Sequence, residues 1–325
     1  MMFDVMAIGE LLIDFTQNGE SEQGNLMFEA NPGGAPGNVL AMLGMLGRKT
    51  AFIGKVGKDR FGELLREALE EQNINTDFLR TTKEAPTTLA LVHKLPNGDR
   101  DFSFYRSPGA DTLLEMDEIP EERIAESRIL HFGTLSMTQQ PARSATKKAV
   151  QIARENQVLV SFDPNLRMPL WKREEDARAA FDFGLANCDI LKISDNEIVW
   201  FTGRDDIRKG IRQIREDYPN IRLVNASLGK DGSMAFCGNE EAFAPAFLRE
   251  NTVDTTGAGD TFCACCLNSV LEGILERPDH DQLREMLTFA NAAASLVTAH
   301  KGALRVMPKR EEAEELIIQF SLNRE

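Results

Sequence analysis

The sequence is poor in positive charge and lacks a long apolar run. Its 37 Lys and Arg residues stand against 51 Asp and Glu residues, which gives a formal net charge of −14. This balance gives no sign of the basic surface with which proteins bind nucleic acid or an anionic membrane. No apolar run approaches the ~20 residues of a transmembrane helix. We therefore expect neither a nucleic-acid partner nor a membrane partner.

Cysteines are few, and a targeting signal is missing. Met1 to Val5 show neither the basic region nor the cleavage site of a signal peptide, so we expect a cytoplasmic protein. Five cysteines, an odd number, argue against a disulfide framework. Cys263, Cys265 and Cys266 lie in an apolar stretch, and the four histidines are scattered. We expect these cysteines to pack in the core rather than bind metal.

Two common nucleotide-binding motifs are absent. The sequence has no Gly-x-x-x-x-Gly-Lys-Ser/Thr, which excludes a P-loop protein. No Gly-x-Gly-x-x-Gly follows the first expected strand, which argues against a dinucleotide-dependent oxidoreductase. Bound nicotinamide or flavin, visible by its absorbance, would revive that alternative.

Short apolar runs alternate with helical patterns along the chain. Strands are expected at 3–8, 51–53, 128–132, 158–162, 189–193 and 222–226. Helices are expected at 36–46, 60–71, 141–155, 174–186, 196–201, 207–217, 283–297 and 310–320. This alternation predicts an α/β fold, with helices on both faces of a mainly parallel sheet, as one domain over residues 1–325. Ligands of such sheets bind at the carboxyl ends of the strands.

One region departs from this alternation. Residues 87–95 and 99–106 flank Pro96-Asn97-Gly98, and Asn-Gly between alternating segments predicts a β-hairpin. No helix beside it covers its apolar residues, so another surface must do so. We expect a lid over the active site or a dimer contact.

The most informative segment is Gly257-Ala258-Gly259-Asp260, which runs into an apolar stretch at 262–275 that predicts a helix. The first amides of a helix lack intrahelical partners and carry a partial positive charge, which suits a phosphate. Asp260 beside them could accept a proton from a hydroxyl group. The alternative is an ordinary turn in which the aspartate caps the helix.

A second glycine-rich segment runs from Gly33 to Asn38 into another expected helix. Glycines let the backbone approach a ligand closely. Asn38 could direct its amide at a hydroxyl-rich ligand, and Asp14, after the first strand, could accept hydrogen bonds from a polyol. The alternative is a Gly/Pro loop with a surface aspartate.

Further polar residues follow expected strands. Arg106 and Arg167 could hold a phosphate or a carboxylate, or could form surface ion pairs. Glu197 could help to organise Mg²⁺. It also forms a capping box with Ser194, and both roles can hold together. Ser227 to Gly232 could border a nucleotide or form a plain turn.

Together these segments resemble the ribokinase-like sugar kinases of the PfkB family, over nearly the whole chain. The N-terminal pattern of the family matches Gly33 to Asn38, and its C-terminal pattern matches Asp254 to Asp260. Within the family, the first of these segments, Phe104 to Arg106 and Asp163 to Arg167 are most similar to bacterial fructokinases. The 2-keto-3-deoxygluconate kinases are close relatives.

The resemblance implies an ATP- and Mg²⁺-dependent sugar kinase, a three-layer α/β/α sandwich with a small β-sheet lid at about 14–35 and 86–108, and a homodimer formed through that lid. It implies that Asp260 is the general base and that Gly257, Ala258 and Gly259 form the anion hole. The other residues are implied as follows: for the sugar, Asp14, Gly33, Gly34, Asn38, Arg106 and Arg167; for the nucleotide, Asn165, Lys192, Ser227, Gly229, Gly232 and Asn291; for Mg²⁺ through water, Glu197; for a monovalent cation such as K⁺, Asp254 and Thr256.

Departures from the family pattern leave alternatives open. Ser194 stands where many members have Asn in their metal motif, which bears on metal affinity. Two arginines near the sugar would suit a carboxylate and hence 2-keto-3-deoxygluconate, whereas the motif set favours fructose. Another ribokinase-like sugar kinase is a further alternative. A non-catalytic sugar sensor should have lost the base or the anion hole, and both are present here.

Overall fold

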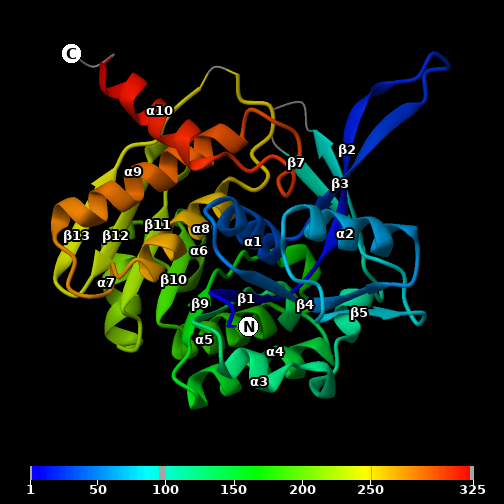
Figure 1. The fold of residues 1–325 in the computed structure, drawn as a ribbon, viewed down its shortest axis with the longest axis horizontal. Helices are drawn as coiled ribbons and strands as arrows, with labels where there is room; N and C mark the ends of the chain where they lie inside the picture. The colour runs from blue at the N-terminus through cyan, green and yellow to red at the C-terminus, as the bar shows by residue number, and fades with distance from the viewer. Residues whose placement is uncertain (1, 95–99, 250, 323–325) are drawn as a thin grey trace.

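Two β-sheets of different size organise the computed structural model, which describes residues 2–94, 100–249 and 251–322. The large sheet has the strand order β13-β12-β11-β10-β9-β8-β1-β4-β5, and the small sheet the order β3-β2-β6-β7. Figure 1 shows the small sheet projecting beside α2, away from the helix layers.

The large sheet is parallel from β5 to β11 and antiparallel at β12 and β13. Its strands are β1 (Val5–Ile8), β4 (Thr50–Gly57), β5 (Leu79–Thr82), β8 (Ile129–Phe132), β9 (Leu159–Phe162), β10 (Ile190–Ser194), β11 (Leu223–Ser227), β12 (Ser233–Cys237) and β13 (Glu240–Ala244). All six expected strands are present. From β1 the chain builds β4 and β5 on one side and β8 to β11 on the other. Such a reversal of strand order marks the crevice in which ligands of α/β sheets bind.

Helices cover both faces of the large sheet. One face carries α1 (Ala35–Met45), α2 (Arg60–Glu71), α8 (Ala258–Leu271), α9 (His280–Val297) and α10 (Arg310–Leu322); the other carries α3 (Glu121–Ala125), α4 (Ala142–Glu155), α5 (Glu174–Asn187), α6 (Asp195–Thr202) and α7 (Ile207–Asp217). Because strand side chains alternate, Val5 and Ala7 enter one core, whereas Met6 and Ile8 enter the other. The predicted three-layer sandwich is confirmed. No helix of the described residues is long and apolar enough to cross a membrane.

The small sheet joins two hairpins that are distant in sequence. Its strands are β2 (Leu12–Glu20), β3 (Leu26–Gly33), β6 (Leu89–Lys94) and β7 (Arg100–Tyr105). The pairs β2–β3 and β6–β7 are antiparallel, and β2 runs parallel to β6. The prediction of paired strands on either side of Pro96-Asn97-Gly98 is confirmed over 89–94 and 100–105, and residues 95–99 lie outside the described part of the chain.

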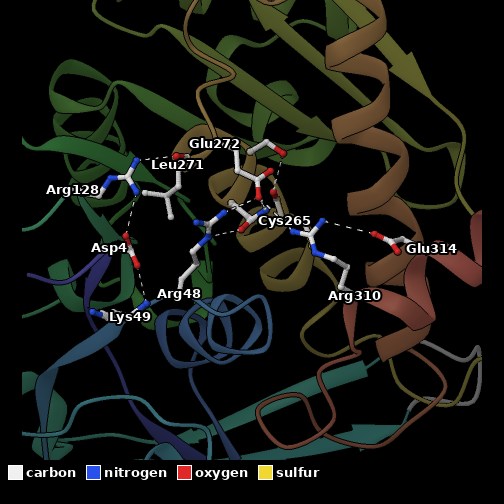
Figure 2. A network of polar contacts seen from close by, with 11 residues as sticks. Asp4, Arg48, Lys49, Arg128, Cys265, Leu271, Glu272, Arg310 and Glu314 are labelled. Carbon is white, nitrogen blue, oxygen red and sulfur yellow. Dashed lines mark hydrogen bonds and ion pairs between the residues drawn. The ribbon is translucent and has the colours of Figure 1, made fainter.

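The helix α8 begins earlier than its apolar residues indicate. It starts at Ala258 rather than at 262 and ends at Leu271 rather than at 275. At its C-terminal end, Arg128 Nη2 donates to the carbonyl oxygen of Leu271 at 2.8 Å, and Arg48 pairs with Glu272 at 2.7 Å (Figure 2). Positive side chains at this end complement the helix dipole. The helix is therefore fixed at the end opposite its glycine turn.

The cysteines of α8 are core residues. Cys263, Cys265 and Cys266 are free thiols, each at most 2% exposed, in the core shared with α1 and α9. Burial raises their pKa values, which keeps the thiols protonated. Their side chains fill core space around α8, the helix that also carries Asp260.

Candidate active site

A cavity of about 750 Å³ opens at the carboxyl ends of β1, β9, β10 and β11, and the small sheet contributes part of its wall. Segments from both ends of the chain meet there. The predicted site residues that line it are Asp14, Gly34, Asn38, Asn165, Arg167, Lys192, Glu197, Ser227, Thr256, Gly257, Gly259 and Asp260. The fold therefore brings the two glycine segments and the strand-end residues to one place.

The start of α8 forms one wall of the cavity. Gly257 is the N-cap, with a left-handed φ of +80°, and a side chain there would collide with Ala303. The first turn closes with a hydrogen bond of 2.8 Å from Thr261 N to the Gly257 carbonyl oxygen. The amides at the start of the helix have no carbonyl one turn earlier to bind, and the dipole adds positive charge. This geometry suits a phosphate group.

The Asp260 side chain lies in this first turn and is half-buried beside the cavity. Asn38 Nδ2 donates to Asp260 Oδ2 at 2.8 Å, so α1 and α8 meet at this carboxylate. Burial raises the pKa of Asp260 from 3.8 to about 6, the hydrogen bond from Asn38 opposes this rise, and the charge of Asp163 adds to it. A carboxylate with such a pKa is ionised at neutral pH yet is a stronger base than an exposed aspartate.

A buried ion pair lies next to the glycine turn. Lys192 Nζ of β10 is 3.0 Å from Asp163, the residue that follows β9. Burial disfavours the ammonium, but attraction by Asp163 and Glu197 outweighs it and raises the pKa of Lys192. A side chain at Gly259 would come within 3.2 Å of Nζ. The glycine thus allows a permanent cation to approach the start of α8.

Glu197 is held by hydrogen bonds on both carboxylate oxygens. Its Oε2 accepts from Ser194 N at 2.9 Å within the predicted capping box, and Oε1 accepts from Leu166 N at 2.8 Å. No group of three or more His, Cys, Asp or Glu side chains in the described part of the chain is placed to hold a metal. A carboxylate occupied in this way fits a Mg²⁺ ion that keeps its waters and is bound mainly by phosphates.

Two glycines make room for acidic residues on the side of the cavity formed by the small sheet. A side chain at Gly33 would collide with the Asp14 carboxylate. Gly34 has a φ of +120°, and a side chain there would come within 2.5 Å of the carbonyl oxygen of Glu10. Larger residues at 33 and 34 would therefore displace Asp14 or Glu10 from the wall.

Arg106 is not part of the cavity wall that the described residues form. Its guanidinium is buried and donates from Nε to Asp111 at 2.8 Å, from Nη1 to Thr138 at 2.8 Å and from Nη2 to the Leu135 carbonyl oxygen at 2.9 Å. A buried charge must be paired and hydrogen-bonded, and these contacts satisfy that requirement. The arginine links the end of β7 to the main body of the fold, and its contact with sugar stays a prediction.

Other predicted residues also lie off the wall. Asn291 Nδ2 donates to the carbonyl oxygens of Ala244 and Pro245 at 3.1 Å, and its Oδ1 accepts from Ser233 at 2.9 Å. A side chain at Gly232 would collide with the backbone at Ala244. The remaining residues off the wall are Gly33, Gly229, Asp254 and Ala258. Their ligand contacts stay predictions.

Asp254, predicted to hold a monovalent cation together with Thr256, joins two segments that are distant in the chain. Its Oδ1 accepts from Thr256 N at 2.7 Å, and its Oδ2 accepts from Gly302 N at 3.3 Å. The carboxylate therefore ties the segment before α8 to the turn beside Ala303.

The cavity is also lined by residues that the sequence did not assign to the site: Glu10, Leu12, Ala35, Phe104, Leu135, Ser194, Thr252, Val253 and Thr255. Glu10 follows β1 closely, so the strand-end rule that found Arg167 applied to it as well. The apolar members gave no signal, because in a sequence an apolar side chain on a cavity wall resembles one in the core.

Comparison with known proteins decides the family. Residues 2–310 match the pfkB family carbohydrate kinase pattern. The chain belongs to this family. This pfkB carbohydrate kinase is 38% identical to probable fructokinase-2 of Arabidopsis thaliana over 315 residues. The aligned region covers 95% of this chain and 94% of the relative.

Solved structures of fructokinases have the same fold. The fructokinase of Xylella fastidiosa with bound ATP superposes with a TM-score of 0.88 at 27% identity, over 98% of this chain and all of its own. A fructokinase double mutant of Vibrio cholerae O395, with fructose, ADP and a potassium ion, superposes with a TM-score of 0.86 at 28% identity. The match covers 97% of this chain and 98% of the mutant's chain. The resemblance to a ribokinase-like sugar kinase, read from the motifs, is confirmed.

Proposed function

We propose that this kinase transfers the γ-phosphate of ATP to a hydroxyl group of fructose. The observation that carries the proposal is the meeting of Asp260, held by Asn38, with the helix amides of Gly257 to Gly259 in one cavity. A base and an anion site side by side are what phosphoryl transfer to a hydroxyl requires. The fructokinase relatives support fructose as the acceptor.

In this proposal the sugar binds between Asp14, Asn38 and Asp260. Asp260 accepts the proton of the attacking hydroxyl, and the amides at the start of α8 stabilise the charge of the transferred phosphate. Arg167 and the ammonium of Lys192 add positive charge on the same wall. Closure of the small sheet over the cavity would exclude water and limit ATP hydrolysis.

The nucleotide and ions take the other predicted residues. Asn165, Ser227, Gly229, Gly232 and Asn291 form the nucleotide side of the proposed site. Mg²⁺ bound with ATP would neutralise phosphate charge, and Glu197 would reach it through water. Asp254 and Thr256 are proposed to hold K⁺, and a potassium ion is present in the Vibrio cholerae relative. The expected cytoplasmic location stays a prediction.

The position of Arg106 favours fructose over 2-keto-3-deoxygluconate. The case for a carboxylate substrate depended on two arginines near the sugar. Arg106 is engaged by Asp111, which leaves Arg167 as the member of this pair on the wall. A single arginine, which in this proposal also serves the transferred phosphate, is weaker support for a carboxylate substrate.

A panel of sugars assayed with ATP and Mg²⁺ tests the proposal. We expect phosphorylation of fructose and not of 2-keto-3-deoxygluconate. Phosphorylation of 2-keto-3-deoxygluconate and not of fructose would change the assigned substrate but not the type of reaction. Absence of turnover with every sugar would favour a sugar-sensing protein instead.

A further inference from the structure

Glu10 is a buried acidic residue with no direct role in the proposed phosphoryl transfer. It lies between β1 and β2, is 3% exposed and lines the cavity. Its Oε1 accepts a hydrogen bond from Ala35 N at 3.0 Å, and its carbonyl oxygen closely approaches Gly34. Glu10 therefore contacts both residues of the turn at which α1 begins.

The helix α1 connects this turn to the proposed base. Its N-cap, Gly34, has no side chain with which to cap the helix, so the carboxylate contact at Ala35 takes that role. One turn further, Asn38 N donates to the Gly34 carbonyl oxygen at 3.0 Å, and Nδ2 holds Asp260 at 2.8 Å. Residues 36–43 are buried. The backbone bond from Asn38 to Gly34 transmits a displacement at the start of α1 to Asn38.

The charged groups around Glu10 do not fully compensate the negative charge of its carboxylate. Arg106 after β7 and Asp111 in the 3₁₀-helix η1 (Ala110–Leu113) face it, and the arginine is bonded directly to Asp111. Asp14 and Asp260 are further acids on the same cavity wall. Burial raises the pKa of Glu10 from 4.5 to about 7, although Arg106 opposes this rise. The carboxyl group therefore exchanges its proton near neutral pH.

We propose that Glu10 is a positioning residue for phosphoryl transfer, whose ionised carboxylate fixes the start of α1 and thereby holds Asn38 on Asp260. This inference rests on the proposed kinase function. A charged acceptor binds an amide at a helix N-terminus more strongly than a neutral one. Protonation of Glu10 weakens that bond, and the contact between Asn38 and the base loosens.

The variant Glu10→Gln keeps the size of the side chain but cannot ionise. We expect its kcat to be roughly tenfold below wild type at pH 8, on the scale of a slightly misplaced reacting group. The ratio should approach one near pH 5.5, where Glu10 of the wild type is itself protonated. A ratio that stays constant with pH would overturn the proposal. Asp206→Asn, which alters the N-cap of α7, should lower stability without a pH-dependent change in kcat.

A second measurement does not depend on turnover. In protein labelled with ¹⁵N-asparagine, the side-chain amide resonance of Asn38 should shift in two steps, near the pKa of Asp260 at about 6 and that of Glu10 at about 7. Glu10→Gln should lose the upper step. If that variant does not fold, a single step in the wild type refutes the proposal. If no sugar is phosphorylated, the kinase function fails, and this titration still decides whether Glu10 acts on Asn38.

Discussion

At the scale of single residues, Asp260 combines two requirements that oppose each other. Burial raises its pKa to about 6, which strengthens it as a base, while the hydrogen bond from Asn38 limits that rise and fixes the carboxylate. The residue therefore stays ionised at neutral pH. The cost of burying its charge falls on the stability of the fold.

Replacement of this base should abolish most of the activity. We expect Asp260→Asn to lower kcat by about two orders of magnitude or more, the scale of a positioned general base. Sugar binding, measured by calorimetry, should be largely kept, because the amide can still bind Asn38. Turnover close to that of the wild type would remove Asp260 from the role of base.

The same substitution should stabilise the protein at neutral and alkaline pH. The pKa of Asp260 rises from 3.8 in the unfolded chain to about 6 in the fold, so folding favours the protonated form. The free energy that the protonated carboxyl group contributes to folding is fully present below pH 3.8, and it is lost as the pH rises through about 6. Because the side chain is partly exposed to the cavity, we expect a gain of about 1–3 kcal/mol for Asp260→Asn at pH 8.

Thermal unfolding at several pH values measures this effect. The gain should shrink towards zero below pH 4, where both proteins carry a neutral side chain. The exposed Asp117→Asn, made in the 3₁₀-helix η2 (Met116–Glu118), is the matched control and should show no comparable pH-dependent gain. A wild type more stable than Asp260→Asn at pH 8 would contradict the view that burial raises the pKa of Asp260.

At the scale of elements, the glycine turn and α8 act as one unit. The N-cap at Gly257 is left-handed and packs against Ala303, while arginines fix the other end of the helix (Figure 2). The sequence predicted a turn followed by a helix, but it placed the helix start too late. The reason is that Ala258, Gly259 and Asp260 carry little of the apolar pattern by which a helix is recognised.

Gly257→Ala should damage both stability and catalysis. A side chain at a left-handed φ costs about 1–2 kcal/mol, and the collision with Ala303 adds roughly 1–3 kcal/mol. The amides should also move, with a loss in kcat of tenfold or more. Gly203→Ala is a matched control, because Gly203 has a φ of +68° and no atom lies within 4 Å of the place a Cβ would take. That variant should show the backbone cost alone, with kcat unchanged.

At the scale of the whole molecule, the small sheet presents apolar side chains to solvent. Leu26 and Met27 of β3 are 56% and 46% exposed, and Tyr105 of β7 is 61% exposed. Both strands form edges of the small sheet, where backbone groups can pair with another chain. These features support the predicted homodimer through the lid.

Sedimentation or light scattering tests that prediction. We expect the wild type to be a dimer and Leu26→Glu with Met27→Glu to be a monomer. Met116→Glu alters a side chain that is 48% exposed outside the small sheet, and it should leave the dimer intact. A wild type that is monomeric at micromolar concentration would contradict the predicted dimer contact through the small sheet.

The amino-acid sequence alone determined the sandwich, because six apolar strands alternate with amphipathic helices and this pattern has few solutions. It also indicated Asp260 and the two glycine segments, because each segment runs into an expected helix and its glycines let the backbone approach a ligand. Only the tertiary structure showed that Arg106 is engaged by Asp111, that Lys192 pairs with Asp163, and that Glu10 holds α1. Those contacts join residues distant in the chain, and whether a charge faces a ligand or a partner depends on which elements the fold brings together.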